Sequence, residues 1–139
     1  MTGFLLDTNV LSELRKRLPD PAVEAWMVEH RGGPMFTSAL VIGEIRLGVE
    51  QVRRRDPAQA ERLAEWLLAV KRGYADRILP VTTEIAEAWA RLNVPDQLPP
   101  IDGLLAATAR VHGLTLVTRN TKDVARAGVP VVNPFESDW

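Results

Sequence analysis

The first structural signal in the chain is Phe4-Leu5-Leu6-Asp7-Thr8-Asn9, a wholly apolar run followed by three residues that favour helix N-caps. A short apolar run of this kind is typical of a strand that is buried on both faces, as in a parallel sheet. The N-cap residues predict that this strand leads directly into a helix. We therefore expect the chain to begin with a strand–helix unit that places polar residues at the carboxyl end of the strand.

The same alternation of apolar strands and amphipathic helices continues along the chain. Further strand-like runs are residues 35–37, 78–81, 114–118 and 129–132. Six further helices are predicted. The first runs from Pro21 to a stop at Gly32-Gly33, the second follows a cap at Thr37 or Ser38, and the third begins at Pro57. The fourth follows a cap at Thr83, the fifth covers Ile101–His112, and the sixth begins at Asn120 or Thr121. This order favours an α/β fold with a mostly parallel sheet. Ligands of such sheets bind at the carboxyl ends of the strands, so acids near those ends are candidate site residues.

The length and composition predict one soluble domain over residues 1–139. Hydrophobic residues make up 46% of the chain and charged residues 25%, which is ordinary for a globular protein. The longest run without a charge, Gly32 to Gly43, is shorter than the roughly 20 residues that span a bilayer. The first apolar run is cut short by Asp7, unlike a signal peptide. We therefore expect a cytoplasmic protein with no membrane association.

The residue types available for metal binding are few. The chain has no cysteine, which excludes disulfides, a thiol nucleophile and a thiolate zinc site. It has only two histidines, His30 and His112, which excludes a histidine-rich site. A bound metal would therefore have oxygen ligands, which points to Mg²⁺ or Mn²⁺. The net charge of −1 means that any contact with nucleic acid is local rather than the effect of a globally basic surface.

Glu44 is the acid whose position is hardest to explain structurally. Its neighbours three and four residues away on the predicted helix are all apolar: Leu40, Val41, Leu47 and Gly48. An unpaired glutamate on a buried helix face is unfavourable, and glutamate is rarely fully buried without a partner. The charge must be held by an ion pair with a residue such as Arg46 or Arg119, by protonation, or by a metal ion.

Asp102 also lies on the apolar side of its predicted helix, beside Leu98, Leu105 and Ala106. A structural explanation is available, because an aspartate in the first helical turn complements the helix dipole by about 0.3–1 kcal/mol. The adjacent Gly103 destabilises a helix by about 1 kcal/mol relative to alanine. That glycine indicates that another part of the protein approaches the backbone closely at this point.

Two further acids follow predicted strands. Asp7 ends the first strand, where it can be either a helix N-cap or a ligand. Asp123 follows Asn120 by three residues, which fits a capping arrangement as well as a site. Thr118 and Asn120 end a strand and can contribute an oxygen to a site there. One metal site explains all four acids together, because clustered carboxylates repel one another and Mg²⁺ or Mn²⁺ relieves the repulsion.

Four segments of the chain, taken in order, resemble the PIN-domain nucleases and, within them, the VapC-type toxins of type II toxin–antitoxin pairs. The segments are Leu5-Leu6-Asp7-Thr8-Asn9-Val10, Thr37-Ser38 with Gly43-Glu44-Ile45 and Gly48, Asp102-Gly103-Leu104-Leu105-Ala106-Ala107-Thr108-Ala109, and Leu116-Val117-Thr118-Arg119-Asn120-Thr121-Lys122-Asp123. The resemblance extends from Leu5 to Phe135. It implies a three-layer α/β/α sandwich with a mostly parallel central sheet, and an endoribonuclease that uses Mg²⁺ or Mn²⁺.

The resemblance also implies roles for individual acids. Asp7, Glu44 and Asp102 fall on the acidic positions of the family. Asp7 and Asp102 would ligate the metal directly, and Glu44 would ligate it or orient its water. The metal would acidify a water that attacks the phosphodiester phosphorus. The family usually has a fourth acid directly after the penultimate strand; this chain has Thr118-Arg119-Asn120 there, so Asp123 is the available carboxylate.

Polar neighbours of these acids complete the predicted site. Under the resemblance, four of them are donors that support the acids or the substrate: Thr8, Asn9, Thr118 and Asn120. Arg119 would contact a phosphate of the RNA or form a salt bridge with one of the acids.

The resemblance implies partners as well. Toxins of this class commonly form homodimers, and a small antitoxin neutralises them while binding DNA through a domain of its own. Two helix faces, one centred on Trp26 and one on Trp66, could receive an antitoxin segment, although both tryptophans could equally be core residues. The alternative function is a PIN-like module that binds RNA or protein without cutting. Its weakness is that such a module does not need the buried charges.

Overall fold

A computed structural model describes residues 3–136 of the chain. Its strands are β1 (Phe4–Leu6), β2 (Met35–Ser38), β3 (Ile78–Leu79), β4 (Thr115–Val117) and β5 (Val131–Val132). Its α-helices are α1 (Thr8–Arg15), α2 (Pro21–Glu29), α3 (Ala39–Arg53), α4 (Pro57–Tyr74), α5 (Thr83–Leu92), α6 (Pro100–His112) and α7 (Thr121–Val124). Two short 3-10 helices, η1 (Ala75–Arg77) and η2 (Ala125–Ala127), follow α4 and α7.

The strands form one five-stranded sheet in the order β3-β2-β1-β4-β5, and every neighbouring pair is parallel. The central strand β1 pairs with β2 on one side, with Leu5 opposite Phe36, and with β4 on the other, with Leu6 opposite Val117. β2 and β3 are therefore added on one side of β1, and β4 and β5, which come later in the chain, are added on its other side. The carboxyl ends of β1 and β4 form the switch point at which α/β sheets bind ligands.

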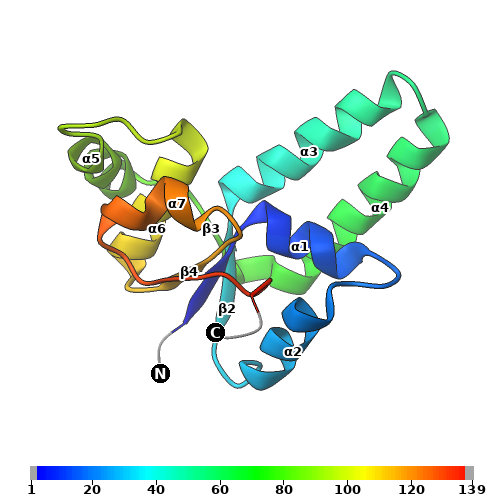
Figure 1. The fold of residues 1–139 in the computed structure, drawn as a ribbon. Coiled ribbons are helices and arrows are strands. Elements are labelled where there is room, and N and C mark those ends of the chain that lie inside the picture. The colour runs from blue at the N-terminus through cyan, green and yellow to red at the C-terminus, as the bar shows by residue number, and fades with distance from the viewer. Residues whose placement is uncertain (1–2, 137–139) are drawn as a thin grey trace.

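The helices cover both faces of the sheet. Crossovers between parallel strands are right-handed, so the connections that run outward from β1 to β3 and those that run from β3 to β5 place their helices on opposite faces. Figure 1 shows this arrangement: α1 to α4 gather on one side of the strands and α5 to α7 on the other. The predicted three-layer α/β/α sandwich is confirmed, with a sheet that is wholly parallel in residues 3–136. The antiparallel pair α3 and α4 extends beyond the sheet as a long arm (Figure 1).

The core lies where both helical layers press on the central strands. Its largest fully buried side chains are Trp26, Leu5, Leu6, Leu67, Ile85, Leu105, Leu116, Val10, Val23, Val41, Val49 and Val117. The apolar run that begins the chain therefore forms the centre of the protein, as expected for a strand covered on both faces. No helix within residues 3–136 combines the length and the apolar character needed to cross a membrane.

The helix boundaries follow the side-chain caps closely. Ser38, not Thr37, caps α3, because its Oγ accepts a hydrogen bond from the backbone N–H of Leu40 at 3.0 Å. The prediction of Thr83 as a cap is wrong by one residue: Thr82 caps α5 through a hydrogen bond from the backbone N–H of Ile85 at 3.2 Å. The helix α2 ends before the predicted Gly32-Gly33 stop. β1 matches its predicted run and β2 extends one residue beyond it, whereas β3, β4 and β5 are shorter than the runs that predict them, because the parallel ladder pairs only part of each of these runs.

Candidate active site

Asp7 sits at the switch point, directly after β1, and combines the two roles that its sequence context leaves open. Its Oδ1 accepts a hydrogen bond from the backbone N–H of Thr8 at 2.6 Å and caps α1. Its Oδ2 accepts one from the Thr118 hydroxyl at 2.8 Å. Only 4% of Asp7 is exposed, and this burial raises the pKa of its carboxyl, while the bonds from Thr118 and Thr8 act in the opposite direction.

Asn9 and Thr118 bind this carboxylate to β4. The Asn9 side-chain amide donates to Thr118 Oγ1 at 3.3 Å and lies 3.4 Å from Asp7 Oδ2. Its carbonyl Oδ1 accepts a hydrogen bond from the backbone N–H of Arg119 at 3.2 Å. Thr118 Oγ1 also accepts one from the backbone N–H of Asn120 at 3.0 Å. Because these bonds join the ends of β1 and β4, they hold the Asp7 carboxylate in one orientation.

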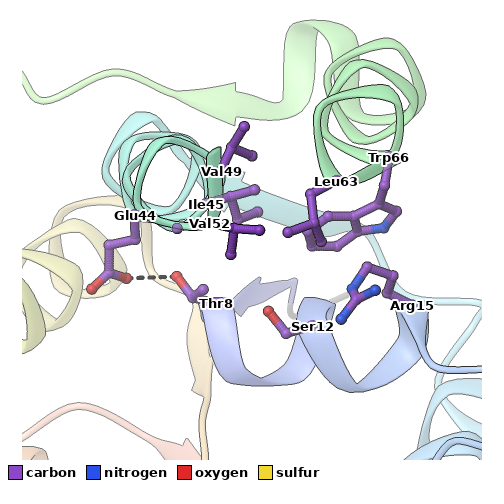
Figure 2. A pocket seen from close by; sticks show the side chains of 10 residues that line it. Thr8, Ser12, Arg15, Glu44, Ile45, Val49, Val52, Leu63 and Trp66 are labelled. Carbon is purple, nitrogen blue, oxygen red and sulfur yellow. Dashed lines mark hydrogen bonds between the residues drawn. The ribbon is translucent and has the colours of Figure 1, made fainter. Parts of the chain in front are cut away.

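Glu44 approaches the site from α3, one and a half turns after the Ser38 cap. Its Oε1 accepts a hydrogen bond from the Thr8 hydroxyl at 2.5 Å (Figure 2). The helix face predicted to be buried is only partly so: Glu44 is half-buried, and its helical neighbour Leu47 is 58% exposed. No described cation forms an ion pair with Glu44; Arg46 pairs with Glu50 instead, at 3.3 Å.

Asp102 lies in the first turn of α6 on the opposite helical layer. Its pKa is raised from 3.8 to about 6, first by burial and then by the negative charges of Asp7, Asp123 and Glu44. All three acids are therefore near enough to Asp102 for their charges to act on its carboxyl. Among the side chains of residues 3–136, none makes a hydrogen bond or ion pair that would neutralise Asp102.

The backbone beside Asp102 is closely packed, as Gly103 predicts. A Cβ atom at Gly103 would lie 3.2 Å from both Leu98 Cβ and Trp89 Cδ1. The indole of Trp89 on α5 therefore rests against the first turn of α6. Its Nε1 is buried without a hydrogen-bond partner among the described residues, which shows that packing rather than hydrogen bonding places this ring.

Asp123 is the exposed member of the group and lies on the short helix α7. The predicted capping arrangement is not formed, since Asn120 occupies the N-cap position of α7 without a side-chain cap bond. Asp123 instead contributes its charge to the environment of Asp102. The side chains of Asn120 and Asp123 line a polar hollow at the carboxyl ends of β4 and β5.

Arg119 does not form the salt bridge that its sequence position left open. No acid in residues 3–136 pairs with its guanidinium, which lies instead over the ring of Phe135 with Cζ 3.7 Å from the ring centroid. The backbone of Arg119 is held by Asn9, as described above, and its side chain is exposed.

The donor set fits a divalent cation of the Mg²⁺ type. The charges of Asp7, Asp123 and Glu44 act on Asp102, and the carboxylate oxygens of these four acids are of the type that Mg²⁺ and Mn²⁺ prefer. Negative charges that lie near one another are unfavourable, and the charges of the three other acids contribute to the raised pKa of Asp102. In the described part of the chain no three acidic or histidine side chains already stand in ligating geometry, so the carboxylates would have to draw closer around an ion.

A groove runs from Glu44 between α1, α3 and α4 (Figure 2). Its volume is about 260 Å³, and its apolar wall consists of Ile45, Val49, Val52, Leu63 and Trp66. The far end is closed by Arg15, whose guanidinium carbon lies 5.7 Å from the centroid of the Trp66 ring. Trp26, by contrast, is only 1% exposed and packs edge-on against Phe4. The helix face of Trp26 therefore belongs to the core and cannot receive a partner.

Sequence reasoning missed two residues that shape the site. Asn93 joins α5 to the loop before α6: its amide donates to the Trp89 carbonyl at 2.7 Å, and its Oδ1 accepts from the backbone N–H of Leu98 at 2.9 Å. Phe135 supports Arg119 from the C-terminal loop. Neither residue carries a local signal, since an asparagine after a helix and a phenylalanine after a proline are ordinary loop residues.

Comparison with known proteins agrees with the architecture. A family model described as PIN domain matches residues 4–129. The chain is 34% identical to VapC ribonuclease Y4jK of Sinorhizobium fredii, covering 96% of this chain and 98% of that protein. It superposes on the crystal structure of FitAcB from Neisseria gonorrhoeae with a TM-score of 0.83 and 33% identity, covering 96% of this chain and 99% of the other. A toxin–antitoxin complex from Klebsiella pneumoniae gives a TM-score of 0.68 at 27% identity, with 96% and 99% covered. The sequence, the fold and the relatives agree that this chain belongs to the PIN-domain family.

Proposed function

We propose that this chain is a metal-dependent endoribonuclease and the toxin of a type II toxin–antitoxin pair. The observation that carries the proposal is the convergence of Asp7, Glu44, Asp102 and Asp123 at the carboxyl edge of a parallel sheet, with no cation among residues 3–136 paired to any of them. Support also comes from the name of the Sinorhizobium fredii relative, a VapC ribonuclease. We expect the protein to act in the cytoplasm.

The proposed roles follow from the surroundings of each acid. Asp7 and Asp102 would hold Mg²⁺ or Mn²⁺, and Glu44, fixed by Thr8, would ligate the ion or orient a water next to it. The ion would supply an acidified water as nucleophile and offset charge on the phosphate. Thr118 and Asn9 keep the Asp7 carboxylate in place through their hydrogen bonds. Asp123, being exposed, would complete the ligand set from α7.

Cleavage of a mixed pool of cellular RNAs, including transfer RNA, tests the activity. We expect cleavage in Mg²⁺ or Mn²⁺ that excess chelator stops and that Asp7→Asn lowers about 100-fold or more, because the metal's contribution is worth several kcal/mol. The variant must come from an identical preparation, since contaminating ribonuclease is the main artefact. Folded Asp7→Asn protein that cuts as fast as the unmodified chain would remove Asp7 from the site. No cleavage by the unmodified chain would favour the non-catalytic RNA- or protein-binding module.

We propose that the groove between α1, α3 and α4 is where the antitoxin binds. The groove begins at Glu44 and ends at Arg15, so an occupying peptide would cover the site and meet one charge of each sign (Figure 2). The half-buried Trp66 offers the aromatic anchor that protein interfaces favour. Co-purification with the product of an adjacent small gene, with and without Trp66→Ala, tests this placement. DNA would then be bound by the antitoxin rather than by this chain.

We also propose a homodimer. An apolar hollow of about 400 Å³ lies on the other side of Glu44, lined by Leu40, Leu47, Val81 and Ile101. Leu47 is 58% and Val81 43% exposed, and exposed apolar residues that lie together are typical of interfaces. Sedimentation of the unmodified chain and of Leu47→Glu tests this: the variant should sediment as a monomer.

A further inference from the structure

The Arg119 guanidinium is held against an aromatic ring, and the negative charge of Glu13 acts on it without forming an ion pair. Its Cζ lies over the Phe135 ring, 3.7 Å from the ring centroid, and its side chain is exposed. No acid among residues 3–136 forms an ion pair with it. An arginine fixed by an aromatic ring loses less side-chain freedom when it binds a ligand, and its planar fork matches a phosphate.

The position of this arginine is tied to the carboxylate centre. The backbone N–H of Arg119 donates to Asn9 Oδ1 at 3.2 Å, and the same Asn9 contacts Asp7 through its amide. A ligand on Arg119 would therefore keep a fixed relation to whatever the carboxylates hold. This link is a property of the backbone, so it survives replacement of the Arg119 side chain.

Arg119 borders the polar hollow at the carboxyl ends of β4 and β5. The hollow measures about 390 Å³ and is also lined by Asn120, Thr121, Lys122, Asp123, Asn133 and Glu136. Its volume is in the range of about 300–1,000 Å³ that is usual for small-ligand sites. The outer wall is shaped by Asn133, which accepts from the backbone N–H of Phe135 at 2.9 Å and donates to Glu136 Oε1 at 3.3 Å.

We propose that this hollow binds a backbone phosphate of the RNA, one next to the phosphate that is cleaved. Arg119 and Lys122 would contact it, and Asn133 and Asn120 would donate hydrogen bonds. The proposal rests on the proposed function. RNA fits because a single strand carries a phosphate on every nucleotide and can reach both the carboxylates and the hollow, which share one edge of the sheet.

The charges of the hollow define what the subsite contributes. Two cations, Arg119 and Lys122, are balanced by Asp123 and Glu136, so the hollow is not a strong anion site by itself. Glu136 accepts a hydrogen bond from Asn133, and the charge of Asp123 also acts on Asp102. A phosphate already brought close by binding at the centre would be contacted by Arg119, which would add to the affinity for the strand and also set its register.

Binding of a fluorescent single-stranded RNA of mixed sequence tests the subsite in the Asp7→Asn background, where the RNA is not cut. Arg119→Gln should weaken binding about tenfold, as expected for loss of a charge-assisted contact. It should also reduce the slope of log K against log salt by about 0.7, the value for one phosphate contact on a single strand. Phe135→Leu keeps the charge and should weaken binding while leaving the slope unchanged.

The matched control is Arg62→Gln, which removes the same charge from the exposed surface of α4, where Arg62 contacts Gln59. In the cleavage assay with an intact Asp7, Arg119→Gln should raise KM with kcat unchanged, and Arg119→Lys should restore the salt slope. If Arg119→Gln and the Arg62→Gln control have the same salt slope and the same KM, the subsite proposal is wrong, while the nuclease proposal is unaffected. Asp7→Asn protein that binds no RNA would also overturn it; the nuclease proposal is judged separately, by metal-dependent cleavage.

Discussion

At the residue scale, the acids of the site differ because their surroundings differ. Asp7 is nearly fully buried, but its carboxylate accepts hydrogen bonds from the Thr118 hydroxyl and from the backbone N–H of Thr8. Asp102 is half-buried and has no such donors in residues 3–136. Burial, and then the charges of three neighbouring acids, raise its pKa to about 6. Buried carboxyls with raised pKa values that lie near one another are typical of catalytic sites.

The raised pKa of Asp102 predicts how stability depends on pH without metal. The folded state holds the proton more tightly than the unfolded chain, so the free energy of unfolding should fall as pH rises from 3.8 to about 6. Asp102→Asn cannot ionise and should flatten the curve in this window and raise Tm by a few degrees at pH 7. Thermal unfolding in chelator at several pH values measures both effects.

The control for this prediction is Asp76→Asn, which removes an exposed acid that lies in η1. It should leave the pH dependence between 3.8 and about 6 as in the unmodified chain. An Asp102→Asn protein that is less stable at pH 7 would mean that the Asp102 charge is compensated in the folded protein, and the like-charge account of the site would be wrong.

At the scale of elements, the site depends on how α5 holds the start of α6. Trp89 rests on Gly103, and Asn93 links the end of α5 to the loop that leads into α6. The N-cap residue of α6 is Pro99, and no side chain forms a cap hydrogen bond there. Asp102 is therefore not held in place by a capping bond. The packing of two helices therefore places this carboxylate.

Gly103→Ala tests this packing. Alanine stabilises a helix by about 1 kcal/mol relative to glycine, but the added Cβ would lie 3.2 Å from both Leu98 and Trp89, and overpacking costs about 1–3 kcal/mol. We expect a net destabilisation of about 1 kcal/mol in denaturant unfolding and a drop in cleavage as Asp102 shifts. Gly73→Ala on α4, where nothing lies within 4 Å, should instead gain up to about 1 kcal/mol. If both variants are stabilised equally, the Trp89 contact does not constrain α6.

At the scale of the whole molecule, the site exists only in the folded chain. Its acids come from the end of β1, from α3, from α6 and from α7, which belong to both helical layers. Bringing them together opposes folding through charge repulsion. A cation that binds all of them would bind the native state alone, so it should stabilise the fold by linkage.

Addition of Mg²⁺ or Mn²⁺ to chelator-treated protein should therefore raise Tm, reaching about 2.7 kcal/mol of stabilisation when the ion is at 100 times its Kd. Asp102→Asn should start from a higher Tm and gain less. Differential scanning calorimetry over a metal titration measures this without any assay of activity. A shift of the same size in Asp102→Asn would place the ion elsewhere on the protein.

The order of elements and most of their boundaries could be predicted, because they depend on local patterns: apolar runs, caps such as Ser38, and the predicted end of a helix at His112, which Gly113 follows with a φ of 66°. The close approach at Gly103 also left a local signal and is confirmed. Pattern alone left open whether Trp26 is a core residue, which it is, and it overestimated the burial of the helix face around Glu44. Helical periodicity marks an apolar face but cannot tell how much of it another element covers.

Only the tertiary structure decided the contacts between residues that are far apart in the sequence. Thr8 and Glu44 are 36 positions apart, and Thr118 and Asp7 are 111 apart. The stacking of Arg119 on Phe135 joins the end of β4 to the C-terminal loop. No local propensity encodes such pairs, because they depend on the sheet order and on how two helical layers close over it. The residue types and their neighbours along the chain define the acids, and the parallel sheet, by aligning the carboxyl ends of β1 and β4, makes a site of them.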